Sequence, residues 1–142
     1  MTPETEQHID RLLASFARLT GQTLAADTQA VWEAPFVVVS HGTEADPIFN
    51  FGNRAALALF ELDWECFTRL PSRKSAEPLE RAARQDLLDR VSRNGFIDDY
   101  EGVRISATGK RFIVREAIVW NVYDPAETFW GQAATFSKWE PL

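Results

Sequence analysis

The chain has 142 residues, which is close to the usual size of one domain, roughly 100 to 150 residues. Hydrophobic residues make up 45% and charged residues 25% of it, a composition that excludes disorder as the dominant state. With 21 acidic and 15 basic residues, the formal net charge of -6 argues against nucleic acid or an anionic membrane as a partner.

No leader pattern opens the chain, and no apolar run approaches the roughly 20 residues that span a bilayer, so we expect a cytoplasmic protein without a membrane segment. The single cysteine, Cys66, has no partner for a disulfide. It also has no cysteine or paired histidine at the spacing of a metal site, which argues against structural zinc.

The first residues predict two helices. Apolar side chains recur at three- and four-residue spacing over residues 4 to 20, and Gly21 is a C-terminal stop; the apolar face comprises Ile9, Leu12, Phe16 and Leu19. Asp27 or Thr28 caps a second, short helix that ends before Pro35. The apolar face of the first helix needs cover, which either the chain's own sheet or a second copy in a homodimer would supply.

The middle of the chain predicts a hairpin followed by helices. Residues 36–39 and 47–51 are short β-rich runs separated by a polar turn. Asn53 and Asp63 are N-cap residues for two short helices. Residues 78–93 carry apolar side chains at helical spacing and predict the longest central helix.

The final third predicts three antiparallel strands, near residues 96–106, 111–123 and 128–139, which makes the fold class α+β. Charged side chains also lie on neighbouring strands of this meander. We expect cross-strand ion pairs between basic and acidic residues there: Arg104, Arg111 and Arg115 with Glu101 and Glu116.

Four segments carry a family resemblance. They read WEAPFVVVSHGTEADPIFNFGNRAALALFELDW, FTRLPSRKSAEP, GFIDDYEGVRIS and GQAATFSKWE, and they resemble stand-alone bacterial members of the MEKHLA domain family. The resemblance implies one PAS-like domain over residues 1–142, with a helical extension at 1–30 and a core at 31–142. The core would hold a five-stranded antiparallel sheet with a helical crossover.

The same resemblance implies a PAS-like sensory or protein-interaction module rather than an enzyme. A related domain in plant class III homeodomain-leucine zipper proteins is linked to regulating dimerisation. No output segment is evident in this chain, so we expect a signal to leave through a homodimer or a separate signalling protein. A pocket for a small apolar ligand would be lined by aromatic and aliphatic residues: Phe36, Val38, Phe49, Phe51, Leu57, Phe60, Tyr100 and Phe136.

Cofactors of the wider PAS group fit this sequence poorly. Cys66 lies earlier in the chain than the cysteine of flavin photosensors. The glutamine that those proteins carry two residues after a glycine on the last strand is also not matched, because Gln132 follows Gly131 directly. Residues 78–94 contain no histidine to ligate haem. The sequence therefore argues against flavin photochemistry and haem and leaves the ligand unnamed.

Two further hypotheses concern charged residues. The basic cluster of Arg69, Arg73 and Lys74 is either an anion contact or a solvated loop. The alternative function is a small cone-shaped α+β enzyme, resembling isomerases and dehydratases of the ketosteroid isomerase type. It would use an acid or a histidine inside a pocket, from the candidates His41, Asp46 and Asp99.

Overall fold

A computed structural model describes residues 1–76 and 81–142. Its helices are α1 (Pro3–Thr20), α2 (Thr28–Glu33), α3 (Arg54–Phe60), α4 (Trp64–Phe67), the 3₁₀ turn η1 (Ser72–Ser75) and α5 (Arg81–Asn94). Its strands are β1 (Val37–His41), β2 (Phe49–Gly52), β3 (Phe96–Ile105), β4 (Arg111–Tyr123), β5 (Phe129–Phe136) and β6 (Lys138–Pro141). The expected start of the longest central helix, Pro78, lies outside the described residues.

The strands form one antiparallel sheet in the order β2-β1-β5-β4-β3, and β6 also pairs with β4. The predicted last strand is therefore divided at Ser137: β5 pairs with the second half of β4, and β6 pairs with the first half. Glu116 of β4 lies between these two paired stretches with a left-handed φ of 53°. Such a residue bends a long strand and ends a regular ladder, which accounts for the division.

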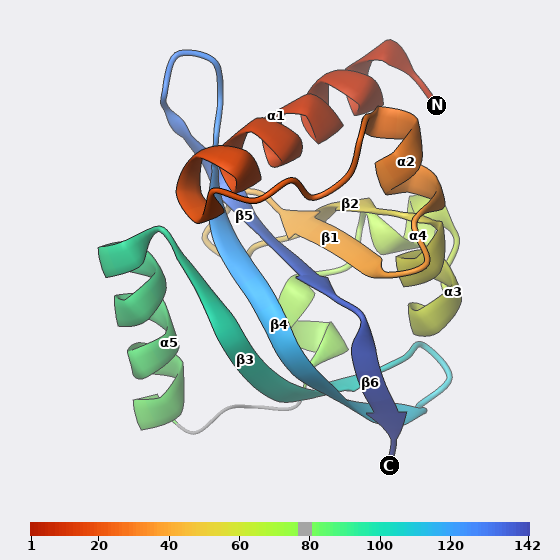
Figure 1. The fold of residues 1–142 in the computed structure, drawn as a ribbon. Helices are drawn as coiled ribbons and strands as arrows, with labels where there is room; N and C mark the ends of the chain where they lie inside the picture. Colours follow the sequence, from red (N-terminus) through yellow and green to blue (C-terminus); the bar gives the residue numbers. More distant parts are fainter. Residues whose placement is uncertain (77–80) are drawn as a thin grey trace.

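Helix α1 covers one face of the sheet (Figure 1). Its first turn is closed by the Thr2 hydroxyl, which accepts from the Thr5 amide, and Gly21 ends the helix at a φ of 71°. Ile9, Leu12 and Phe16 are buried against one face of the sheet, where the Phe16 ring meets Trp120 edge-on at 4.8 Å between centroids. The chain's own sheet covers these three residues of the apolar stripe.

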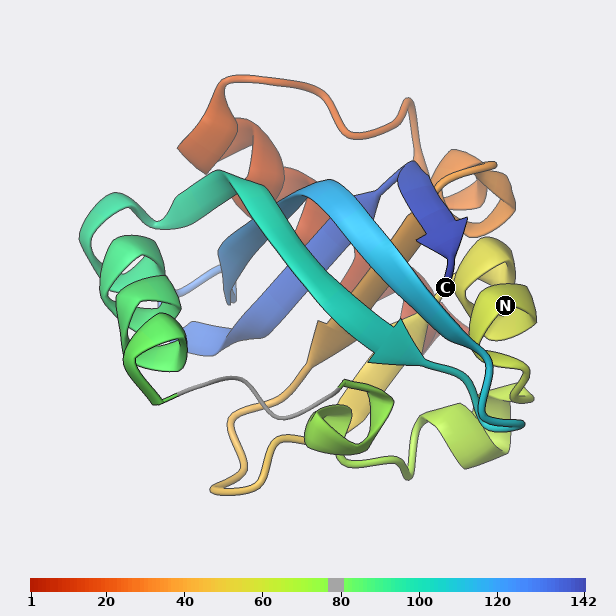
Figure 2. The same cartoon turned by 90° about the horizontal axis from the view of Figure 1, so that it is seen from below.

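The opposite face is covered at its two edges. Helices α3 and α4 contact β1 and β2 near one edge, and α5 contacts β3 at the other (Figure 2). Phe60 and Phe67 pack with Phe49 on the first side, while Val91 packs on Ile97 at the second. Helix α5 also reaches Val119 of the neighbouring strand β4, while α3 and α4 stay near β1 and β2.

Asn53 is a fully buried cross-link between these parts. Its Oδ1 accepts hydrogen bonds from the backbone amides of Val38 and Ala56, both at 3.1 Å. Its Nδ2 donates to the backbone carbonyls of Val31 at 3.0 Å and Phe36 at 2.8 Å. One amide thus joins α2, the start of β1 and the N-terminus of α3, and all four of its hydrogen-bonding positions are used.

We predict that Asn53→Ala lowers the free energy of unfolding by at least about 3 kcal/mol, because it removes an N-cap and leaves buried backbone groups without partners. Asp63→Ala is the matched control: Asp63 caps α4 through the Cys66 amide at 2.8 Å but makes an exposed contact. Its loss should cost only about 1 kcal/mol. Urea unfolding of both variants measures the difference, and equal losses would contradict the cross-linking role of Asn53.

Candidate functional site

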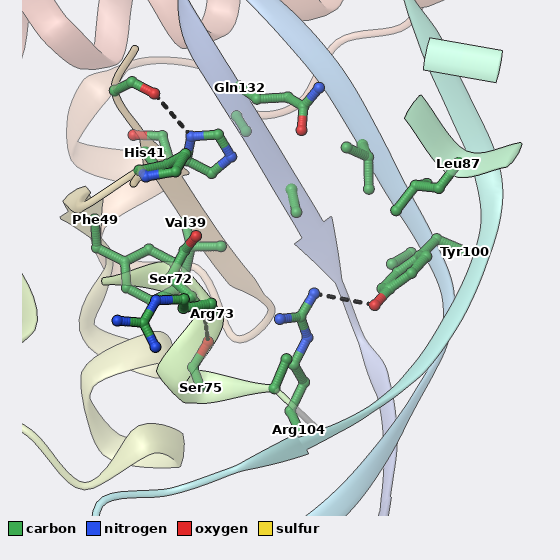
Figure 3. Close-up of a pocket in the computed structure, with 18 of the residues that line it drawn as sticks. Val39, His41, Phe49, Ser72, Arg73, Ser75, Leu87, Tyr100, Arg104 and Gln132 are labelled. Carbon is green, nitrogen blue, oxygen red and sulfur yellow. Dashed lines mark hydrogen bonds between the residues drawn. The ribbon is translucent and has the colours of Figure 1, made fainter. Parts of the chain in front are cut away.

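A cavity of about 640 Å³ lies on the face of the sheet opposite α1, between the middle strands and the segments η1 and α5 (Figure 3). Its walls are mostly apolar, with Val114, Ala117 and Val119 from β4 and Ala134 and Phe136 from β5. A cavity of this size and character falls in the range of small-molecule sites in proteins.

The eight residues expected to line a pocket divide between the two faces of the sheet. Phe49, Phe60, Tyr100 and Phe136 line the cavity. Leu57 packs against the same core without lining it, whereas the remaining three belong to the core on the α1 face: Phe36, Val38 and Phe51. Val38 and Val39 are successive residues of β1 and therefore point to opposite faces. Phe51 is turned away from the cavity because the pairing of β1 with β2 is irregular between Ser40 and His41, so that Phe49 and Phe51, two residues apart, face opposite sides.

Several lining residues were not expected from the sequence as pocket residues. The apolar ones follow from strand alternation once Phe49 and Phe136 are placed, since Val39 and Ala134 lie on the same sheet face. Arg104 and Gln132 were missed because a polar strand residue is ordinarily read as solvent-facing.

Of the predicted basic cluster, Arg73 borders the cavity, while Arg69 and Lys74 are exposed and do not line it. The Nε of Arg73 donates to both carboxylate oxygens of Asp46, at 3.1 and 3.2 Å. Glu44 also lies at this rim, and its Oε1 accepts from the Ile48 amide at 3.2 Å. The acidic groups of the rim are thus engaged within the chain.

Arg104 and Tyr100 form a polar pair in the cavity wall, on strand β3 (Figure 3). The Nη2 of Arg104 donates to the Tyr100 hydroxyl at 3.0 Å, and the guanidinium lies 5.6 Å from the ring centroid. A side chain at Gly102 would place its Cβ 2.4 Å from that hydroxyl, so the glycine makes room for the phenol along its own strand. The expected cross-strand ion pair forms at Arg115 with Glu101, at 2.6 Å, and Arg104 instead faces the cavity.

The candidate residues of the enzyme hypothesis do not form one group. His41 and Asp46 line the cavity, but Asp99 does not, and it pairs with Arg90 at 2.6 Å. The Nδ1 of His41 lies 2.9 Å from the Gly42 carbonyl oxygen. The free thiol of Cys66 is exposed on α4 and does not line the cavity.

His8 joins helix α1 to the face of the sheet that this helix covers. The Trp130 indole donates to His8 Nδ1 at 3.2 Å, so the neutral ring carries its proton on Nε2 and donates it to the Ser40 hydroxyl at 2.8 Å. Ser40 in turn donates to Asn50 of β2. Burial, followed by the charge of Arg11, lowers the pKa of His8 from 6.5 to about 4.

Solved PAS-type domains share this fold. The PAS domain of a Colwellia psychrerythraea protein aligns with a TM-score of 0.64 at 12% identity, over 80% of this chain and 92% of that domain. The fungal blue-light photoreceptor Vivid, in its photo-excited state, aligns with a TM-score of 0.64 at 10% identity, over 89% of this chain and 94% of its own. The chain is therefore a PAS-fold domain.

The family follows from sequence. The model of the MEKHLA domain matches residues 6–141, and the chain belongs to that family. The rice homeobox-leucine zipper protein HOX32 is 23% identical over 126 residues in Oryza sativa subsp. indica and in subsp. japonica. The match covers 89% of this chain and 15% of the length of each rice protein. The expected MEKHLA family and the expected α+β PAS-like fold are both confirmed, whereas the expected stand-alone bacterial type stays a prediction. The sheet order does not favour the cone-shaped enzyme.

Among the described residues, no helix is long and apolar enough to cross a membrane. The same part of the chain holds no group of three or more histidine, cysteine or acidic side chains placed to bind a metal ion.

We predict that acid destabilises the protein through His8. Its pKa is about 4 when folded and 6.5 ordinarily, so below pH 6.5 the unfolded chain binds a proton that the folded chain does not. The contribution of neutral His8 to the free energy of unfolding is complete above pH 6.5 and is lost as the pH falls to about 4. The total loss is up to about 3 kcal/mol.

The measurement is urea unfolding of the wild type and His8→Gln at several pH values between 7.5 and 4.5. The glutamine variant should be less stable at pH 7.5, because its hydrogen bonds to Ser40 and Trp130 change, but its stability should fall less steeply with acid. Parallel pH profiles would rule out a buried, neutral His8.

Proposed function

We propose that this chain is a PAS-like sensory or protein-interaction module that binds a small apolar ligand in the cavity and does not act as an enzyme. The observation that carries the proposal is the position of the cavity. It lies on one face of the middle strands, and helix α1 lies on the other face of the same strands. A change in the cavity can therefore act on the docking of α1 without crossing any other layer.

Strand β1 is the shortest link between the two faces. Val39 and His41 line the cavity, while the side chains of Val38 and Ser40 contact the α1 layer, through the apolar core and the hydrogen bond to His8. Because close-packed elements have few alternative arrangements, a small shift of β1 favours one docked position of α1 over another. Ligand binding would act by shifting the population between such positions.

The output surface in this proposal is the exposed side of α1 with the start of β5. Arg11 of α1 stacks over Trp130 at 4.1 Å, and Trp130 is 39% exposed. Aromatic and arginine side chains are common anchors of protein interfaces. A homodimer or a separate signalling protein would dock there, and the net charge of -6 disfavours nucleic acid as the partner. The free thiol of Cys66 is compatible with the cytoplasm.

We predict that the wild type binds 1-aminoanthracene, an uncharged fluorescent apolar compound, in a saturable manner. Ala134→Phe places a large ring in the cavity and should weaken that binding at least about tenfold, because the displaced volume no longer accepts the probe. Ala126→Phe is the matched control, since Ala126 is exposed in the turn before β5 and outside the cavity wall.

Fluorescence titration gives the affinities, and circular dichroism checks that both variants fold. No saturable binding to the wild type, or equal weakening in the two variants, would contradict a ligand site in this cavity.

A further inference from the structure

We propose that the ligand of this cavity carries a carboxylate group and that Arg104 binds it. This inference rests on the proposed function and specifies the chemical class of the ligand: a small monocarboxylic acid whose remaining part is apolar and about the size of an aromatic ring. It starts from the charge distribution around the cavity, where the Arg104 guanidinium has no acidic partner among residues 1–76 and 81–142.

The charged residues that line the cavity differ in their partners. Asp46 and Arg73 pair with each other, and Glu44 accepts from the Ile48 amide. Arg104 is partly buried, and its hydrogen bond goes to the neutral hydroxyl of Tyr100. Across residues 1–76 and 81–142, Arg104 makes no ion pair.

An arginine held in a mostly apolar wall is unfavourable unless its charge is balanced. The planar guanidinium has several N–H donors and matches the two oxygens of a carboxylate. A ligand carboxylate would therefore supply the counter-charge that the described part of the chain does not.

Tyr100 adds a second donor at the same point. Because its oxygen accepts from Arg104, its own O–H proton is left to donate to a ligand oxygen. Gly102 allows this arrangement, since any side chain there would meet the phenol oxygen. Tyr100 and Arg104 thus present N–H and O–H donors together, which suits an anionic oxygen better than an uncharged apolar group.

Two further polar side chains of the cavity make hydrogen bonds within the chain. Ser75 donates to the Ser72 carbonyl at 2.7 Å, and Gln132 donates to Asn121 at 3.3 Å. The remaining wall is apolar and partly aromatic, including Phe49, Phe60 and Phe136. The cavity therefore combines a cationic group at one end with an apolar space for the rest of the ligand. This fits a ligand with one acidic group and an otherwise apolar structure.

The test compares 4-phenylbutyrate with 4-phenylbutyramide, which have the same body and differ in the charge of the head group. Isothermal titration calorimetry at pH 7.5 should show the carboxylate binding at least about tenfold more tightly to the wild type, because charge-assisted hydrogen bonds are stronger than neutral ones. Arg104→Met should abolish this preference, chiefly by weakening the carboxylate, and Tyr100→Phe should reduce it while keeping the cation.

Arg115→Met is the matched control. It removes the same charge from an arginine that pairs with Glu101 outside the cavity wall, so the preference for the carboxylate should remain. Circular dichroism checks the fold of each variant, and the wild-type comparison stands even if one of them does not fold.

The outcomes separate the two proposals. If the wild type binds both compounds equally, or prefers the amide, the carboxylate inference is overturned while the ligand-binding function stands. If Arg115→Met loses the preference as completely as Arg104→Met, the effect belongs to overall charge and the role of Arg104 is overturned. If neither compound binds and 1-aminoanthracene also fails to bind, both the inference and the proposed function fall.

Discussion

The need to bury both faces of the middle strands determines the rest of this structure. Strands β1, β4 and β5 carry apolar side chains on both sides, so each strand contributes alternate residues to two separate cores. Helix α1 covers one side, with Trp120 as the largest fully buried side chain beneath it. On the other side, the helices cover the two sheet edges and a cavity remains between them.

This asymmetry gives the two faces different physical roles. On the α1 face, hydrogen bonds join the helix to the strands at His8, which bonds to Ser40 and Trp130, and at Ser15, whose hydroxyl accepts from the Tyr123 amide. The cavity face has room for a guest molecule and presents Arg104 at one end of an apolar wall. Because the two layers share the same strands, the proposed function links occupation of the cavity to the docking of α1 through direct packing.

Local chemistry made most helices and strands predictable from the sequence. The face of the sheet to which a strand residue points was not predictable in the same way. The caps Asp27, Asn53 and Asp63 begin the helices where the sequence indicated, because short polar side chains satisfy free helix amides. Val38 and Phe51 could not be assigned to a face, since both faces of their strands are apolar. The spacing of charges predicted a surface ion pair for Arg104. The pairing of β3 with β4 is irregular around Tyr100, and charge spacing does not reveal such an irregularity. The expected division into residues 1–30 and 31–142 stays a prediction.

Coupling between the cavity and α1 through the shared sheet is tested most directly by amide hydrogen exchange, measured peptide by peptide with and without saturating 1-aminoanthracene. Coupling predicts that exchange changes in the cavity strands β4 and β5 and also in residues 3–20, which contact the opposite face. A change confined to the cavity strands and α5, with the exchange of residues 3–20 unaltered at full occupancy, would contradict it.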